Sequence, residues 1–251
     1  DVLAPLRLQG HLALAGFGEV QEKQLQTQCQ TLTERLSPLM EDWPNDLSVQ
    51  SANFTLGQTE LQAQWADGDT VWKQNAERTA CLQIDVRAGS VAEGKAKQRV
   101  PRVHTLTDVW VSHLLACASG LHTTSIQVGL NGVVQIDAID AATALAHLQA
   151  LVDAYQAAWQ QPLPVARKTA CAYLMAQQSP ELNPSEAAEQ AFVGNARQPG
   201  EQARSEHLKR AFDGFDVIAS DLPVWAQRLY GPMVAAAHLL VNEDEAEGEA
   251  A

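Results

Sequence analysis

Basic residues are scarce in this sequence: 17 Lys and Arg stand against 30 Asp and Glu, which gives a formal net charge of -13. A protein whose whole surface binds nucleic acid normally carries net positive charge, because its cations displace the counterions around the phosphates. The composition therefore excludes such a surface, and any DNA contact has to be local. Five of the acidic residues lie in the last ten positions, so we predict a disordered, solvated acidic tail over residues 242–251.

Paired cysteines and long apolar runs are also missing. The four cysteines lie far apart without a CxxC pair, which argues against a zinc site or a redox dithiol and predicts buried thiols in a reduced cytoplasm. No run of 18 apolar residues and no signal segment occurs, so we expect a soluble cytoplasmic protein with no membrane partner. The chain opens on Asp1 rather than Met, which predicts a domain cut from a longer polypeptide.

The common catalytic signatures are absent too. The sequence has no GxxxxGK[ST] or GxGxxG loop, so we expect no ATP site and no cofactor in this chain. It has no HExxH and no GxSxG, which argues against a metalloprotease and a hydrolase triad. His113 has apolar neighbours and is predicted to be a hydrogen-bonded packing residue.

Hydrophobic periodicity predicts an α/β fold with a mixed sheet flanked by helices. Alternation of apolar residues predicts strands at 6–14 and 82–86, and hairpins over 61–71 and 125–136. Apolar residues at helical spacing predict helices at 25–40, 106–117, 140–159, from 184 onward and 222–240. Thr105 with Asp108 has the spacing of a capping box, and Asp140, Asn183 and Asp221 are predicted caps. Strands dominate the first half of the chain, and the C-terminal half is rich in helices.

One motif carries possible metal chemistry. Asp85, Glu93 and Lys95 fit the D…(D/E)xK pattern, in which two carboxylates hold Mg²⁺ while the lysine stabilises developing charge. The motif requires its second acid and its lysine on a strand beside the first acid. Glu93 instead lies in a segment with Gly89 and Gly94, as a turn would. An active magnesium site is therefore the alternative interpretation.

One basic strip stands out, because residues 94–107 contain four cations and no acid. In an extended segment Lys95, Lys97 and Arg99 project from one side and can contact phosphates. With Arg102 they are the candidate DNA-contact residues. The alternative is an ordinary solvated loop.

Three sets of segments are similar to one family, the C-terminal domain of the exodeoxyribonuclease V gamma chain (RecC). The first set is Leu12–Gly16 followed by WVSHLLACA at 110–118. The second is the predicted helix at 141–159 followed by PLPVARKTACAY at 162–173. The third set comprises FVG at 192–194, AFDGFD at 211–216 and AQRLYGPM at 226–233.

The resemblance implies a PD-(D/E)XK nuclease-like domain over residues 1–241 that has lost its metal-binding acids, with residues 18–80 as a family-variable insertion. It implies a non-catalytic structural and DNA-contacting domain of the RecBCD helicase–nuclease, which acts in double-strand break repair and homologous recombination. RecB-like and RecD-like subunits and forked or duplex-end DNA would be its partners. ATP and Mg²⁺ would be bound in the partner subunits.

Two other hypotheses stay open. One is an active Mg²⁺-dependent nuclease that uses Asp85, Glu93 and Lys95, and the other is a stand-alone interaction protein unrelated to DNA. A scaffold domain has to leave its partner surfaces uncovered, so exposed apolar patches at residues such as Trp43, Trp65 or Trp72 would favour the scaffold.

Overall fold

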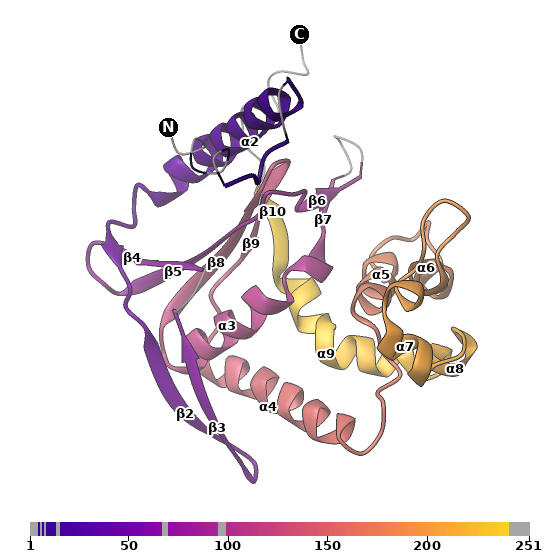
Figure 1. Ribbon diagram of the computed structural model, residues 1–251. Helices are drawn as coiled ribbons and strands as arrows, with labels where there is room; N and C mark the ends of the chain where they lie inside the picture. The colour runs from indigo at the N-terminus through magenta and orange to yellow at the C-terminus, as the bar shows by residue number, and fades with distance from the viewer. Residues whose placement is uncertain are drawn as a thin grey trace.

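A mixed β-sheet forms the centre of the molecule. The structure is a computed structural model, which describes residues 5, 7, 9–13, 16–66, 70–94 and 99–240. Within these residues, six strands follow the order β1-β4-β5-β8-β9-β10 (Figure 1). Their bounds are β1 Asn45–Asp46, β4 Val71–Gln74, β5 Ala80–Val86, β8 His122–Gly129, β9 Gly132–Ile136 and β10 Ala237–Leu240. Only β5 and β8 are parallel, so the predicted mixed sheet is confirmed.

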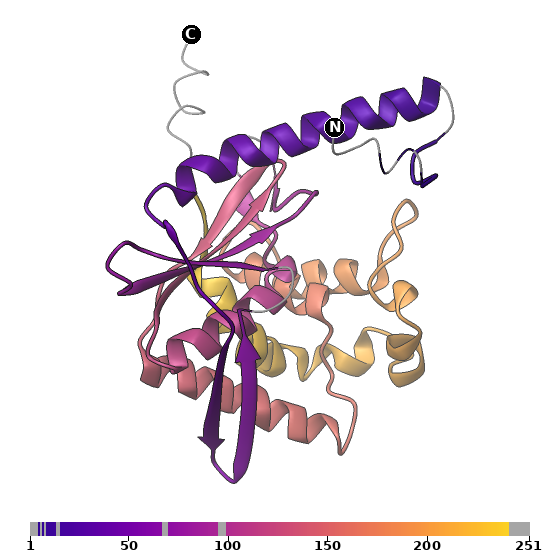
Figure 2. The same cartoon turned by 60° about the vertical axis from the view of Figure 1, so that its left-hand side comes forward.

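Helices cover both faces of this sheet. Parallel strands need a crossover connection, and α3 (Thr107–Ala118) supplies it between β5 and β8. One face packs with α3 and α4 (Ala141–Ala158) into the larger core, while α2 (Gly16–Met40) lies across the other face (Figure 2). Four successive residues of β5, Cys81 to Ile84, are buried, as expected for a strand covered on both sides.

The predicted helix over residues 25–40 is confirmed, although α2 already begins at Gly16. Its side chains Leu32, Leu36 and Leu39 pack on a second, smaller core cluster, which includes Ile84 and Ile126. The predicted strand at 6–14 is not supported by the residues that are described there. Pro5 and Arg7 are helical and Gly10 lies in a turn, while Leu6, Leu8 and Leu14 fall outside the described residues.

The predicted hairpin over 61–71 is wrong. Strand β3 (Thr59–Trp65) pairs with β2 (Gln50–Leu56) around Gly57, whose φ of 62° suits a tight turn. Strand β4, which begins at Val71, belongs to the central sheet instead. The β2–β3 arm buries Phe54, Leu56 and Trp65 in the larger core. Alternation identified the strands but not their pairing, and Asp67-Gly68 lies outside the described residues.

The C-terminal half is rich in helices, as predicted: α5 Arg167–Gln177, α6 Pro184–Val193, α7 Glu206–Ala211, α8 Asp216–Ala219 and α9 Leu222–Ala236. The helices that begin at 184 and 222 were predicted, whereas α5, α7 and α8 were not. Asp140 caps α4 by accepting from the Thr143 amide at 2.9 Å, and Asn183 caps α6, so both predicted caps are confirmed. Asp221 precedes α9 without a side-chain cap bond. The last helix was expected to reach Leu240, but it ends at Ala236 because the next four residues pair with β9.

Residues 18–80, predicted to be an insertion, provide most of α2 and the strands β1 to β4. Two of these strands, β1 and β4, belong to the central sheet. This segment is therefore part of the packed fold, and its variability in the family stays a prediction. The predicted acidic tail at 242–251 lies outside the described residues.

Candidate functional site

Asp85 lies near the end of β5, where two side chains hold its carboxylate. The parallel register places it beside Gln127 of β8, whose Nε2 donates to Asp85 Oδ2 at 2.7 Å. Arg87 Nε lies 3.3 Å from the same oxygen. The neighbouring position on β8 is thus a neutral amide that donates a hydrogen bond, rather than a second carboxylate.

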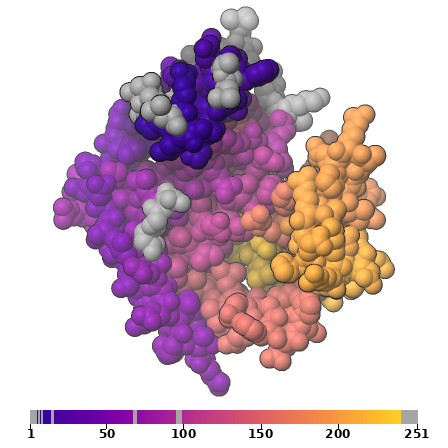
Figure 3. Space-filling model, in the orientation of Figure 1, coloured from indigo at the N-terminus to yellow at the C-terminus, as the bar shows by residue number. Residues whose placement is uncertain are grey.

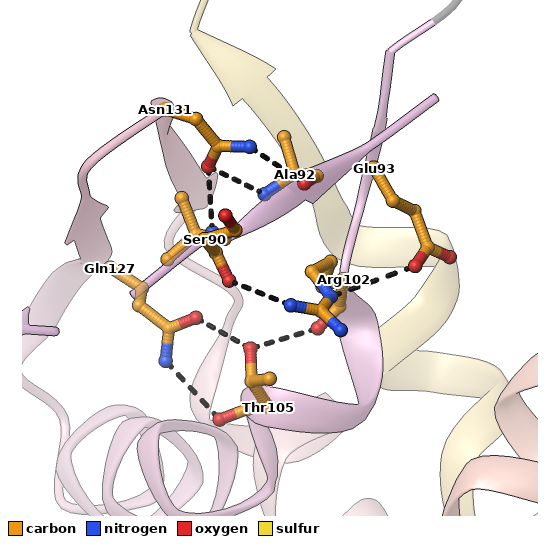
Figure 4. Close-up of polar contacts among 8 residues, drawn as sticks. Ser90, Ala92, Glu93, Arg102, Thr105, Gln127 and Asn131 are labelled. Carbon is orange, nitrogen blue, oxygen red and sulfur yellow. Dashed lines mark hydrogen bonds and ion pairs between the residues drawn. The ribbon is translucent and has the colours of Figure 1, made fainter. Parts of the chain in front are cut away.

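Gln127 extends this contact into a partly buried polar network (Figure 4). Its Nε2 also donates to the Thr105 carbonyl oxygen at 3.2 Å, and Thr105 Oγ1 lies 2.7 Å from Gln127 Oε1. The same hydroxyl lies 2.8 Å from the Arg102 carbonyl oxygen. The predicted capping box at Thr105 is therefore wrong: Leu106 is the N-cap of α3, and the threonine hydroxyl joins β8 to the 3-10 turn η2 (Val103–Thr105).

Glu93 belongs to a different sheet from Asp85. It lies on β6 (Ala92–Glu93), which pairs with β7 (Val100–Pro101). Asn131 anchors β6 by accepting from the amides of Val91 and Ala92 at 2.9 and 3.2 Å, and Figure 4 shows its contact with Ala92. The Glu93 carboxylate is exposed and pairs with Arg102, whose Nε lies 3.6 Å away.

The predicted magnesium triad is only partly described, because Lys95 lies outside the described residues. Asp85 and Glu93 pair with different arginines, Arg87 and Arg102. Among the residues that the structure describes, no group of three or more His, Cys, Asp or Glu is placed to hold a metal ion. A magnesium role for Asp85, Glu93 and Lys95 stays a prediction.

The basic strip is described at its C-terminal end alone, since Lys95 and Lys97 also lie outside the described residues. Arg99 Nη1 donates to the Asn131 carbonyl oxygen at 3.1 Å. Arg102 Nη1 lies 3.4 Å from the Ser90 carbonyl oxygen (Figure 4). The side chains of both arginines thus form hydrogen bonds with backbone carbonyl oxygens nearby. Their contact with DNA stays a prediction.

A cavity that the sequence did not predict lies between the segment around Glu93 and Arg102 and the C-terminal helices. Its volume is about 530 Å³, and its wall includes Glu93 and Arg102 on one side and α5, α6 and the 194–204 loop on the other. Figure 3 shows a recess between the magenta strands and the orange lobe that carries this loop. Three cations line the cavity, namely Arg102, Lys168 and Arg204.

Glu201 in the cavity wall caps helix α5 from a distant part of the chain. Its carboxylate accepts from the amides of Lys168 and Thr169 at 3.0 and 2.9 Å and from Thr169 Oγ1 at 3.0 Å. The local N-cap, Ala166, makes no side-chain cap bond. Glu201 thereby satisfies amides that a helix N-terminus leaves without partners. Because Glu201 follows Lys168 by 33 positions, no local motif could have identified it.

His104 lies in the same wall and reports the charge around it. Burial, followed by the positive charges of Lys168, Arg102, Arg167 and Arg87, lowers the pKa of His104 to about 4. A neutral imidazole at physiological pH is the result.

His113 is buried and hydrogen-bonded, which confirms its prediction as a packing residue. Its Nδ1 lies 2.9 Å from Ser125 Oγ, and that hydroxyl donates to Gln83 Oε1 at 2.7 Å. Because the serine proton is used on Gln83, the Nδ1 proton of His113 is the one shared with Ser125. Burial lowers the pKa of His113 to about 4. The Ser–His pair is thus enclosed in the core and has no access to a substrate.

The thiols and the tryptophans depart from expectation in two places. Three cysteines are free and buried as predicted, but Cys29 is exposed on α2.

Trp65 and Trp72 are only 3% and 4% exposed, and Trp43 packs on the second core cluster. The exposed aromatic side chains are elsewhere: Phe17 on α2 is 82% exposed, and Trp159 after α4 is 74% exposed.

The described helices include none with the length and apolar character needed to cross a membrane.

No curated protein matches the sequence. The sequence model of the RecC C-terminal domain matches residues 1–178, which is more than half of the chain. The match contains Asp85, the strands β6 and β7 and all of α5, whereas the third set of similar segments lies beyond it. This chain therefore belongs to the RecC C-terminal domain family.

Proposed function

We propose that the chain is a non-catalytic structural and DNA-contacting domain of the RecBCD helicase–nuclease (exodeoxyribonuclease V), which acts in double-strand break repair and homologous recombination. Membership in the RecC C-terminal domain family implies a role as a part of RecBCD. The non-catalytic character and the DNA contact are inferences from the residues around Asp85 and from the local basic charge.

The setting of Asp85 carries the proposal. A two-carboxylate magnesium site needs a second acid on a strand beside the first. The neighbour of Asp85 on β8 is Gln127, which donates to the carboxylate, and Arg87 neutralises it. Glu93 lies on β6, outside the central sheet. Asp85 thus has the partners of a structural carboxylate.

The topology supports a PD-(D/E)XK nuclease-like core. Strands β5 and β8 are parallel with α3 as their crossover, and β4 and β9 flank them in antiparallel pairing. Helices cover both faces, as the predicted fold requires. In this interpretation the sheet of a nuclease is kept as a scaffold.

RecB-like and RecD-like subunits and forked or duplex-end DNA are the proposed partners, and ATP and Mg²⁺ are expected in the partner subunits. Exposed apolar side chains support a scaffold, since a domain that binds partners leaves such surfaces uncovered when alone. Phe17 and Trp159 are the most exposed aromatic residues among those described.

A cleavage assay tests the non-catalytic part of the proposal. The purified chain, an Asp85→Ala variant and an Asp213→Ala control are each incubated with end-labelled linear duplex DNA and Mg²⁺. Asp213 is a matched control because it is an exposed aspartate in the loop between α7 and α8. We expect none of the three to cleave faster than a sample with EDTA. Cleavage that Asp85→Ala abolishes and Asp213→Ala retains would establish the active nuclease instead.

Co-purification tests the partner assignment. The tagged chain is expected to retain RecB-like and RecD-like subunits on an affinity column. If it retains neither, the chain is a stand-alone interaction protein and the scaffold proposal is wrong.

A further inference from the structure

The cavity beside α5 brings together cations from three separate segments. Arg102 comes from the turn that follows β7, Lys168 from the first turn of α5, and Arg204 from the 3-10 turn η3 (Gln202–Arg204). In a chain with a net charge of -13, such a concentration of positive charge is unusual. The cavity is therefore a candidate site for an anion.

Two of these cations are available to a ligand. Among the described residues, the side chains of Lys168 and Arg204 form no hydrogen bond and no ion pair. Of the two acids in the wall, Glu93 pairs with Arg102, whereas Glu201 caps α5 and keeps its negative charge, because the backbone amides that it binds are neutral. Three cations against two carboxylates leave the wall with a net positive charge.

His104 lies in the same positive field. Burial first, and then the positive charges of Lys168, Arg102 and two further arginines, lower the pKa of its imidazole. The charges that disfavour the imidazolium would stabilise an anion in the cavity.

The lining favours a phosphate over a base. Among the described residues that form the wall, His104 is the only one with an aromatic ring, and Phe, Tyr and Trp are absent, so a platform for stacking bases is missing. Amide side chains are present instead: Gln190, Asn195 and Gln198 can donate to phosphate oxygens alongside Lys168 and Arg204. The recess of about 530 Å³ has the size of a small-ligand pocket, so it can take only a short stretch of a strand.

We propose that this cavity binds the phosphodiester backbone of single-stranded DNA, with Lys168 and Arg204 as its phosphate-binding residues. The inference rests on the proposed function, since it names a site for the DNA contact of that function. Binding of this kind reads no sequence, because phosphate contacts fix the position of the strand without distinguishing its bases. Arg102 and the cavity amides complete the wall around the phosphate.

A salt titration of binding tests the site. A fluorescein-labelled oligothymidylate of about 20 nucleotides is titrated with the whole chain, and its anisotropy is followed at several salt concentrations. The cavity variant carries Lys168→Gln and Arg204→Gln. The control variant carries Arg78→Gln and Arg210→Gln, which remove the same charge at exposed positions outside the cavity. Thermal melting first establishes that both variants are folded.

The cavity variant is expected to bind about tenfold more weakly at low salt, with a salt slope smaller by about 1.4, because two phosphate contacts on a single strand are lost. The control is expected to match the wild type. If all three proteins bind alike, the cavity is not the site, while the proposed DNA contact stands through another surface. If the wild type binds no DNA but binds a polyglutamate peptide, the site is one for acidic protein segments. The proposed DNA contact and the proposed DNA-binding cavity are then both wrong. Binding of neither probe also overturns both.

Discussion

Replacement of Glu201 by alanine should destabilise the C-terminal lobe without touching the central sheet. The carboxylate is the partner of two backbone amides and one hydroxyl at the start of α5, at distances of 2.9 to 3.0 Å. Ala166 provides no substitute cap. The Glu201→Ala variant therefore leaves the amides of Lys168 and Thr169 without their acceptor.

The cost can be estimated from the bonds that are lost. An N-cap side chain contributes about 1 kcal/mol, and a negative charge at a helix N-terminus adds about 0.3–1 kcal/mol. An amide left unsatisfied in a part-buried position adds about 1 kcal/mol more. We expect the free energy of unfolding to fall by about 2–3 kcal/mol, which corresponds to a decrease in Tm of roughly 4–12 °C for a domain of this size.

Differential scanning calorimetry measures this decrease, with Glu189→Ala as the control. Glu189 is an exposed glutamate on α6 with no bond to another helix among the described residues, so its replacement should change Tm by less than about 2 °C. Glu201→Gln keeps an acceptor oxygen but loses the charge, and should fall between the wild type and Glu201→Ala. A Tm for Glu201→Ala within about 1 °C of the wild type would refute the assignment of Glu201 as the cap of α5.

Two further predictions concern the buried histidine and the thiols. The pKa of His113 is about 4 in the folded protein and 6.5 as its ordinary value, so the unfolded chain takes up the proton first as the pH falls. The contribution of His113 to stability is therefore intact above pH 6.5 and is lost towards pH 4, by about 1.4 kcal/mol per pH unit. Urea titrations at several pH values give the free energy of unfolding, which should depend less steeply on pH in the His113→Gln variant than in the wild type. Iodoacetamide at pH 8 should label Cys29 within minutes and spare the buried thiols, because burial raises the pKa of Cys171 to about 12 and also raises those of Cys81 and Cys117. Mass spectrometry of the peptides decides this, and rapid labelling of Cys171 in the folded protein would contradict the placement of α5.

Features that depend on neighbouring residues could be predicted from the sequence alone. The leucine spacing of α2, the caps at Asp140 and Asn183, and the existence of strand β5 each follow from periodicity or from a side chain that bonds its own turn. The β8–β9 hairpin was predicted for the same reason, although Gly132 pairs with Gly129 and the loop is Leu130-Asn131 rather than Asn131-Gly132. Each of these features depends on interactions between residues that are close in the sequence, so it does not depend on which distant segments pack together.

Features that depend on distant segments were decided by the tertiary structure. Strand β3 pairs with β2 instead of β4, and residues 237–240 leave the helical pattern because β9 offers an edge to pair with. Thr105 uses its hydroxyl on Gln127, 22 positions away, rather than on its own helix. The cavity formed by Arg102, Lys168 and Arg204 arises in the same way, since these cations are separated by 66 and 36 positions (168 − 102 and 204 − 168). Sequence patterns record the preferences of each segment, but the free energy of pairing and packing selects which segments meet, and so the candidate site exists only in the folded chain.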